Sequence, residues 1–93
     1  MLFEWDETKA ESNLRKHGVG FDEAQTAFLD EMALVFDDPD HDVDEHRFLL
    51  LGMSAHLRLL VVVHCARQDD KVIRIISARV ATRRESDVYM GTG

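Results

Sequence analysis

The chain has 93 residues, 45% of them hydrophobic and 31% charged, values typical of one small globular domain that spans residues 1–93. A single cysteine excludes an internal disulfide and a zinc site built on cysteines, and the formal net charge of −7 argues against a surface that binds polyanions everywhere. The N-terminus lacks the features of a signal peptide and no apolar run reaches the roughly 20 residues of a membrane span, so we expect a cytoplasmic protein without a membrane partner.

A short apolar segment and a helix are expected at the N-terminus. The segment LFEW, at 2–5, can form an edge strand or an arm against the core. Asp6 is a good N-cap for a helix that should run to about His17, because Gly18 can adopt the left-handed conformation in which helices end. One face of this helix carries Asn13, a polar side chain that needs hydrogen-bond partners if it is buried.

A second helix should begin near Phe21, with Gly20 as its N-cap and Glu23 at the position from which a carboxylate bonds back to the cap. The segment MALVF, at 32–36, is compatible with a strand. After it comes the acidic stretch DDPDHDVDEH, which contains the only proline of the chain and which we interpret as a loop.

The acidic loop raises the question of a metal site. Its aspartates alternate as the ligands of a calcium loop do, at Asp38, Asp40, Asp42 and Asp44. The glycine and the bidentate glutamate that such a loop needs are absent from the matching positions. His41 and His46 beside these carboxylates leave a transition-metal site open as an alternative. We favour a solvated acidic loop that holds no metal.

The second half of the chain predicts three strands and a helix. The strands are RFLLLGM, LRLLVVVHCAR and KVIRIISAR, and the short turns between them favour an antiparallel meander. His64 and Cys65 lie in an aliphatic run that suggests a satisfied, half-buried imidazole and an inert buried thiol. Thr82 and Glu85 have the spacing of a capping box for a last helix. The predicted fold class is α+β, with two N-terminal helices, an antiparallel sheet of three to four strands and a C-terminal helix.

The positive charge is concentrated in the second half of the chain. Residues 47–93 carry a net charge of +4, from eight basic and four acidic side chains, whereas residues 1–46 carry −11, from three basic and fourteen acidic ones. Eight of the eleven basic residues are arginines, whose planar guanidinium binds phosphate or carboxylate through two hydrogen bonds. A local anion site in the second half is therefore compatible with the negative total.

Arg74 lies inside the third predicted strand and Arg79 lies at its end. In a regular strand these two side chains point to opposite faces, unless a bulge intervenes. Burying an unpaired guanidinium costs several kcal/mol. We therefore expect Arg74 to contact an anion. The candidates for this anion are a bound phosphate, Glu45 and an acid of the first helix.

Three cations gather where this strand meets the last helix: Arg79, Arg83 and Arg84. Cations at a helix N-terminus are mildly disfavoured by the helix dipole, which suggests an anionic ligand at the same place. A solvated helix start is the alternative. Two further arginines, Arg58 and Arg67, lie at strand ends and are expected to be solvated.

The sequence resembles the BrnT toxins of bacterial type II toxin–antitoxin systems. The resemblance rests on three motifs that occur in order: FEWDETKAESNLRKHGVGFDEA at 3–24, EHRFLLLG at 45–52 and IRIISARVATRRESDVY at 73–89. Gly20 departs from the family, which usually has serine or another better cap there, and His64 stands near a place where the family commonly has an aromatic residue.

The resemblance implies a RelE-like ribonuclease fold and a toxin that degrades mRNA and arrests growth. It also implies neutralisation by a BrnA-type antitoxin, which is a ribbon-helix-helix protein. The toxin would contact operator DNA only through this antitoxin. Metal-independent RNA cleavage, without a cofactor, needs a base for the 2′-hydroxyl, an acid for the leaving 5′-oxygen and cations for the phosphate. We expect His17, Glu45 and Arg79 to be catalytic. The expected phosphate-binding cations are Lys16, Arg47, Arg74 and Arg83.

Alternatives stay open at this stage. His17 also closes a helix and can be purely structural, and Glu45 can simply pair with Arg47. A non-catalytic binding module would use the arginines to dock an acidic partner. A metal-dependent hydrolase would instead use the acidic loop.

Overall fold

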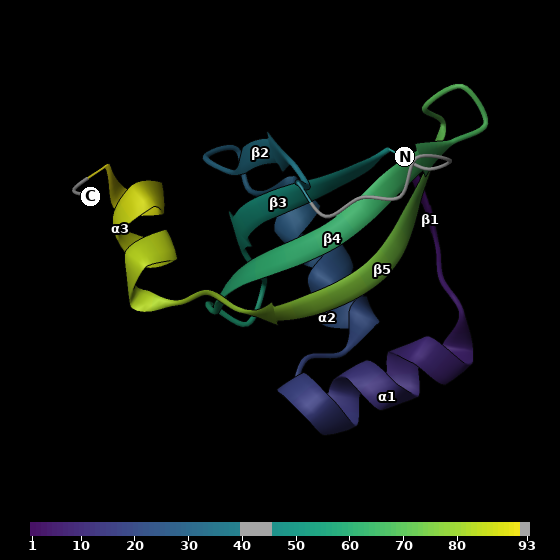
Figure 1. The fold of residues 1–93 in the computed structure, drawn as a ribbon, viewed down its shortest axis with the longest axis horizontal. Helices are drawn as coiled ribbons and strands as arrows, with labels where there is room; N and C mark the ends of the chain where they lie inside the picture. Colours follow the sequence, from purple (N-terminus) through teal and green to yellow (C-terminus); the bar gives the residue numbers. More distant parts are fainter. Residues whose placement is uncertain (40–45, 92–93) are drawn as a thin grey trace.

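The structure is a computed structural model, and it describes residues 1–39 and 46–91. The elements follow one another in the order β1 (Leu2–Glu4), α1 (Glu7–His17), α2 (Phe21–Thr26), the 3₁₀ turn η1 (Ala27–Leu29), β2 (Leu34–Asp37), β3 (Arg47–Met53), β4 (Leu59–Arg67), β5 (Val72–Val80) and α3 (Arg83–Met90) (Figure 1). The helices and the β3–β4–β5 meander confirm the expected order of elements. No helix within the described ranges is long and apolar enough to cross a membrane.

The strands form one five-stranded sheet in the order β1-β5-β4-β3-β2. β1 pairs with β5 in parallel, from Leu2 with Val72 to Glu4 with Arg74, and the other neighbours are antiparallel. The prediction of three to four strands is therefore wrong in number, because the sheet has five. The prediction that all strands are antiparallel is wrong for β1. A three-residue strand that pairs with a segment near the other end of the chain leaves no local pattern from which the pairing can be read.

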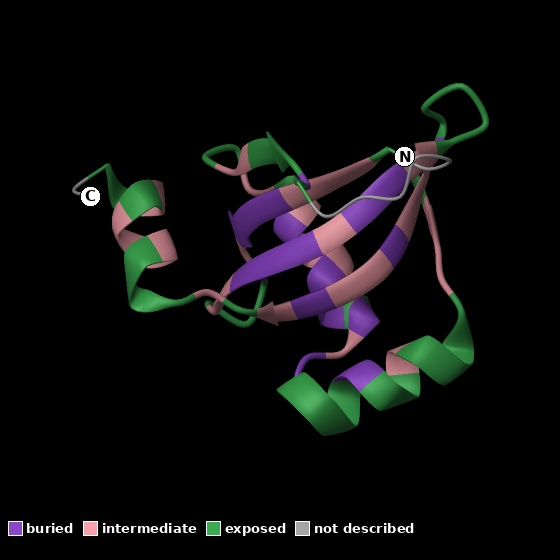
Figure 2. Ribbon diagram, in the orientation of Figure 1, coloured by how far each residue is buried: buried purple, intermediate pink, exposed green. Residues whose placement is uncertain are grey.

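One face of the sheet carries the hydrophobic core. α2 and η1 lie against this face, behind the sheet in the view of Figure 1, and the buried part of the ribbon in Figure 2 follows the contact. Complete burial of a side chain such as Phe21 or Leu60 stabilises the fold by roughly 1.5–3 kcal/mol. The buried cluster consists of Val19, Phe21, Ala24, Ala27, Leu50, Leu60, Val62, Ile75 and Ala78.

α1 lies along the edge of β5 beyond the short pairing with β1. It begins at its N-cap Asp6 and ends at Gly18, which has a positive φ of 70°, as predicted. Asn13 donates to the carbonyls of Ala78 (2.8 Å) and Val19 (2.9 Å) and accepts from the N–H of Ala78 (3.1 Å). The amide of Asn13 therefore does at this edge what a neighbouring strand would do, which explains a polar residue on the buried side of the helix.

A β-bulge interrupts β5 at Ile76. Val63 of β4 pairs with Ser77, whereas the next residue, His64, pairs with Ile75, so that Ile76 is one extra residue in β5. Residues before and after the bulge therefore do not follow one regular alternation.

The bulge places Arg74 and Arg79 on the same face of the sheet. Arg74 lies opposite Cys65, and Arg79 lies opposite Val61. Cys65 and Val61 lie four positions apart in β4. They therefore share a face of the sheet, and their partners share it with them. Regular alternation would have put these two side chains on opposite faces. That expectation is wrong for this pair because the bulge intervenes. We call this side of the sheet, which carries Arg47, Arg67, Arg74 and Arg79, the arginine face.

Candidate functional site

A row of polar side chains crosses the arginine face. Glu4 of β1 is in register with Arg74 of β5. Arg74 is in turn paired with Cys65 of β4, and Cys65 with Arg47 of β3. Because paired residues point to the same side and neighbouring strands are about 4.8 Å apart, the row brings one carboxylate and two guanidiniums together over three strand spacings.

The carboxylate of Glu4 lies between two arginines. Its Oε2 accepts a hydrogen bond from Arg74 Nη1 at 2.7 Å, and Arg67 Nε is 3.8 Å from the same oxygen. The side chains of Glu4 and Arg74 are 35% and 30% exposed, so a ligand has access to the pair. Arg74 thus has the carboxylate partner that was expected, but the partner is Glu4 of β1 and not an acid of α1. The other expected partner, Glu45, lies outside the described residues. The solvation predicted for Arg67 is only half right, since its guanidinium also contacts Glu4.

Arg79 holds the start of α3. Its Nη1 and Nη2 donate to Glu85 Oε1 and Oε2 at 2.8 and 2.9 Å. Glu85 also accepts from the N–H of Thr82 and donates its own N–H to Thr82 Oγ1, which confirms the predicted capping box. The hydrogen bonds from Arg79, more than any other contact, lower the pKa of Glu85 to about 2. The carboxylate therefore stays charged and keeps the guanidinium of Arg79 occupied.

Arg83 and Arg84 follow on the first turn of α3, where the cation cluster was expected. The side chain of Arg83 is 94% exposed, and its Nε is 4.0 Å from Asp87 Oδ1. Arg84 is also exposed. Such pairs on a helix surface contribute little to stability, so these guanidiniums are available to a ligand.

Lys16 and His17 lie in a different place, on the last turn of α1. Both are exposed, and they line a groove of about 220 Å³ between α1 and the bulged part of β5. The predicted site residues that the structure describes thus lie in three places: on the arginine face, on the first turn of α3 and at the edge of β5. Glu45 lies outside the described residues.

An apolar hollow of about 210 Å³ lies next to the arginine face, between the sheet and α3. Its lining residues are Phe36, Leu49, Leu51, Val61, Glu85 and Val88. α3 itself has no buried residue, and a second polar contact holds it: Tyr89 donates its hydroxyl to Asp30 Oδ2 at 2.6 Å. This hydrogen bond raises the pKa of Tyr89.

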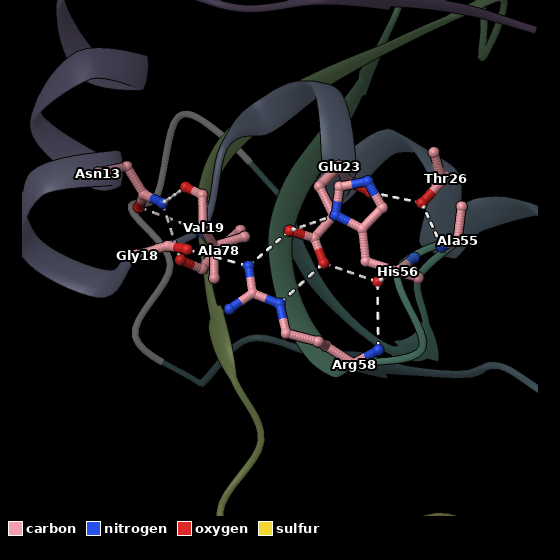
Figure 3. Close-up of polar contacts among 10 residues, drawn as sticks. Asn13, Gly18, Val19, Glu23, Thr26, Ala55, His56, Arg58 and Ala78 are labelled. Carbon is pink, nitrogen blue, oxygen red and sulfur yellow. Dashed lines mark hydrogen bonds and ion pairs between the residues drawn. The ribbon is translucent and has the colours of Figure 1, made fainter.

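An ion pair between a buried carboxylate and a partly exposed guanidinium joins α2 to the turn between β3 and β4 (Figure 3). Arg58 donates through Nε (3.0 Å) and Nη2 to the carboxylate of Glu23, which is 5% exposed, and Ser54 Oγ donates to the same group at 2.7 Å. The hydrogen bonds from Arg58 lower the pKa of Glu23 although burial acts in the opposite direction. The solvation predicted for Arg58 and the capping role predicted for Glu23 are both wrong, because the two residues find each other across 35 positions.

The neighbours of this ion pair give it a structural role. Arg58 Nη2 also donates to the carbonyl of Gly18 at 2.9 Å, and His56 Nδ1 lies 3.5 Å from Glu23. Thr26 Oγ1 accepts from the N–H of Ala55 at 2.8 Å. The cluster therefore fastens the end of α1, the helix α2 and the β3–β4 turn together, and its arginine is committed to this task.

Cys65 is buried, as the sequence predicts, whereas His64 is buried and not half-buried as expected. The imidazole packs against the rings of Phe28 and Phe48, and its Nδ1 is 3.1 Å from the carbonyl oxygen of Val62. Removal from water lowers the pKa of His64, so the ring is neutral at physiological pH. A neutral, enclosed imidazole in the core is a structural residue.

The described residues provide no candidate metal site outside the acidic loop. Within residues 1–39 and 46–91 no three metal-ligating side chains lie together. His46 is 2.9 Å from Asp37 and stacks on Phe48. Asp38 of the expected loop is buried and not solvated. Four other residues of the loop lie outside the described ranges: Asp40, His41, Asp42 and Asp44.

Glu4 is the site residue that the sequence did not reveal. The only local signal was the alternation in LFEW, which puts Glu4 on the side opposite Phe3 and Trp5. Its position beside Arg74 follows only from the parallel pairing of two segments that are 70 residues apart.

Comparison with known proteins relates this geometry to a family. A family profile described as the ribonuclease toxin, BrnT, of type II toxin-antitoxin systems matches residues 5–85. A search of curated proteins gave no significant match. The crystal structure of the Brucella abortus ribonuclease toxin, BrnT, is similar, with a TM-score of 0.66 and 24% identity, and the match covers 89% of this chain and 100% of that one.

The structural similarity establishes the fold as that of a BrnT protein, and the description as RelE-like stays an expectation. The profile match covers most of the chain and confirms the resemblance seen in the three sequence motifs. The chain belongs to the BrnT family, the ribonuclease toxins of type II toxin–antitoxin systems.

Proposed function

We propose that this chain is a metal-independent RNA endonuclease whose reaction takes place on the arginine face. The observation that carries the proposal is the row in which the carboxylate of Glu4 lies beside Arg74 and Arg67, with Arg47 two strands away from Arg74. A carboxylate among guanidiniums is the combination that cleavage by the neighbouring 2′-hydroxyl requires, because the reaction needs one proton acceptor and several cations.

In the proposed reaction the guanidiniums of Arg74, Arg67 and Arg47 bind the scissile phosphate. Glu4 takes the proton of the 2′-hydroxyl, the 2′-oxygen bonds to phosphorus, and the bond from phosphorus to the 5′-oxygen breaks. The leaving oxygen takes a proton from water, and the products are a 2′,3′-cyclic phosphate and a 5′-hydroxyl. A positioned base contributes roughly 10²–10⁴ to the rate of such a step.

Two residues that the sequence suggested as catalytic, Arg79 and His17, are less well placed for this reaction. Arg79 is on the same face, but it must leave Glu85 before it can bind a phosphate. His17 lies at the β5 edge, and no hydrogen bond within the described chain joins it to the row around Glu4. We therefore propose Glu4 as the base, Arg74 as the main phosphate ligand and Arg79 as a residue that positions α3.

Metal independence is part of the proposal because of the charges around Glu4. A divalent cation prefers several oxygen ligands, and here the carboxylate of Glu4 already faces two guanidiniums. The positive field of these arginines attracts phosphate and repels a second cation.

We further propose that the nuclease arrests growth by degrading mRNA and that a BrnA-type ribbon-helix-helix antitoxin neutralises it. Membership in a family of type II toxins supports an antitoxin partner. The apolar hollow beside Arg79 and α3 provides a surface on which a protein partner can cover the arginine face. Contact with operator DNA would then be made by the antitoxin.

The test uses purified protein and a 5′-labelled single-stranded RNA. We expect the wild-type chain to cleave it equally well with and without EDTA and to leave cyclic phosphate ends. Glu4→Gln should reduce the rate constant for cleavage about 100-fold or more, and Arg74→Ala by a similar factor. Glu11→Gln, which removes an exposed carboxylate of α1, is the matched control and should cleave like the wild type.

Several results would contradict the proposal. An inactive wild-type chain, or activity that EDTA abolishes, removes the metal-independent nuclease. Folded Arg74→Ala protein that still cleaves RNA but no longer binds the antitoxin would remove Arg74 from the reaction and assign it to partner binding. A wild-type chain that binds the antitoxin but does not cleave RNA would favour the non-catalytic binding module. Induced expression without the antitoxin should stop bacterial growth, and expression of Glu4→Gln should not.

A further inference from the structure

A second group of cations lies apart from the arginine face, on one side of α1. Lys9, Lys16 and His17 line the groove between α1 and β5 together with Ser12 and Asn13. Their spacing follows the helical period, so these five side chains form a single stripe. Within the described chain, no carboxylate lies within ion-pair distance of Lys9 or Lys16. The half of the sequence to which they belong carries a net charge of −11, from three basic and fourteen acidic side chains.

The charges of α1 are sorted by face. Its acids Glu7 and Glu11 line a separate hollow on the other side of the helix, next to Trp5. The helix dipole accounts for Lys16 and His17, because cations are favoured in the last turn. It does not account for Lys9, which lies in the first turn, where a cation is disfavoured. The stripe therefore has a charge pattern that helix stability alone does not produce.

The floor of the groove is the bulge of β5. Ile76, the extra residue, and Ser77, the next one, close the groove opposite the lysines. Ser77 pairs with Val63, which lies on the same face of β4 as Cys65 and Val61. Ser77 therefore belongs both to the groove and to the arginine face, and the two cationic regions are continuous across the edge of β5.

We propose that this groove binds backbone phosphates of the RNA strand whose scissile bond lies on the arginine face, an inference that rests on the proposed nuclease function. The ammonium groups of Lys9 and Lys16 neutralise the phosphate, and a ring N–H of His17 and the hydroxyls of Ser12 and Ser77 donate hydrogen bonds to its oxygens. Contacts to phosphate oxygens carry no sequence information, so this contact is independent of base sequence.

Binding of an uncleavable RNA tests this inference without relying on catalysis. The probe is a fluorescent 12-nucleotide single strand with 2′-O-methyl groups, and the dissociation constant is measured by anisotropy from 50 to 300 mM salt. The test variant is Lys9→Ala with Lys16→Ala. The matched control is Arg15→Ala with Lys71→Ala, which removes the same charge from exposed positions outside the groove.

Loss of two phosphate contacts should raise the dissociation constant roughly 10-fold at 100 mM salt and lower the slope of log K against log salt by about 1.4, since each contact on a single strand contributes about 0.7. The control should shift the constant less than about 2-fold and keep the wild-type slope.

Equal slopes for the test variant, the control and the wild type would overturn the inference and leave an acidic protein segment as the occupant to examine. Absence of any RNA binding by the wild type would overturn it as well. A wild type that binds RNA with the expected slopes but does not cleave it would refute the nuclease mechanism alone, because the slope reports the groove and not the reaction.

Discussion

Arg79 and Glu85 form a bidentate ion pair that joins the end of β5 to the first turn of α3. Because the pKa of Glu85 is lowered to about 2 from 4.5, the pair contributes stability that is fully present above about pH 4.5 and is lost as the pH falls toward 2. After solvent screening of the partly exposed guanidinium, we expect a contribution of about 1–2 kcal/mol.

Replacement of Glu85 by Gln should therefore lower the free energy of unfolding at pH 7 and make it less sensitive to acid. Urea denaturation at pH 7 and pH 3 measures both effects, and the gap between variant and wild type should narrow at pH 3. Glu31→Gln, at an exposed position, is the control and should follow the wild type. A gap of the same size at both pH values would show that the charge of Glu85 does not stabilise the fold.

Replacement of Asn13 by Ala should destabilise the protein by about 3 kcal/mol. The change removes the amide that satisfies both backbone groups of Ala78 and the carbonyl of Val19 at a buried edge, where unmade hydrogen bonds are costly. Ser12→Ala, at an exposed position on the same helix, should change the free energy of unfolding by less than about 0.5 kcal/mol. Equal urea midpoints for the two variants would mean that water replaces Asn13 at the β5 edge.

The parts of the fold that could be predicted are those in which neighbours in sequence are also partners in space. Asp6, Gly18 and the capping box of Thr82 and Glu85 lie within a few residues of the groups they bind, so composition and spacing locate the helix ends. The turns of the meander are equally local. Long strands with an aliphatic pattern also place most of the core on one face.

The candidate site could not be predicted in the same way, because it depends on contacts between distant segments. Glu4 reaches Arg74 only through the parallel strand pair, and the shared face of Arg74 and Arg79 depends on the bulge at Ile76. A bulge adds one residue without a composition signal, and every side chain after it changes side. The arginines could be identified as anion ligands from their type, but their grouping required the register.

Separate and combined changes of Glu23 and Arg58 should show that the two residues stabilise the fold as a unit. Arg58→Ala leaves a buried carboxylate without its guanidinium, so it should lower the urea midpoint more than Glu23→Gln does. In the double variant the unpaired charge is gone, and the midpoint should lie above that of Arg58→Ala alone. Arg84→Ala serves as the exposed control. Strictly additive effects would argue against coupling between the two side chains.

Replacement of Tyr89 by Phe should loosen α3 without unfolding the sheet. The helix has no buried residue, and the hydroxyl of Tyr89 is a polar group that holds it, through the bond to Asp30. Asp30 keeps its bonds from the N–H groups of Met32 and Met53, so the β2 side of the contact should remain ordered. Hydrogen exchange followed by mass spectrometry should show faster exchange in residues 83–90 and unchanged exchange in β4, while the thermal midpoint falls only slightly. Unchanged amide protection in α3 would mean that the Arg79–Glu85 pair and the apolar hollow hold the helix without Tyr89. Faster exchange in β4 would show that α3 stabilises the sheet itself.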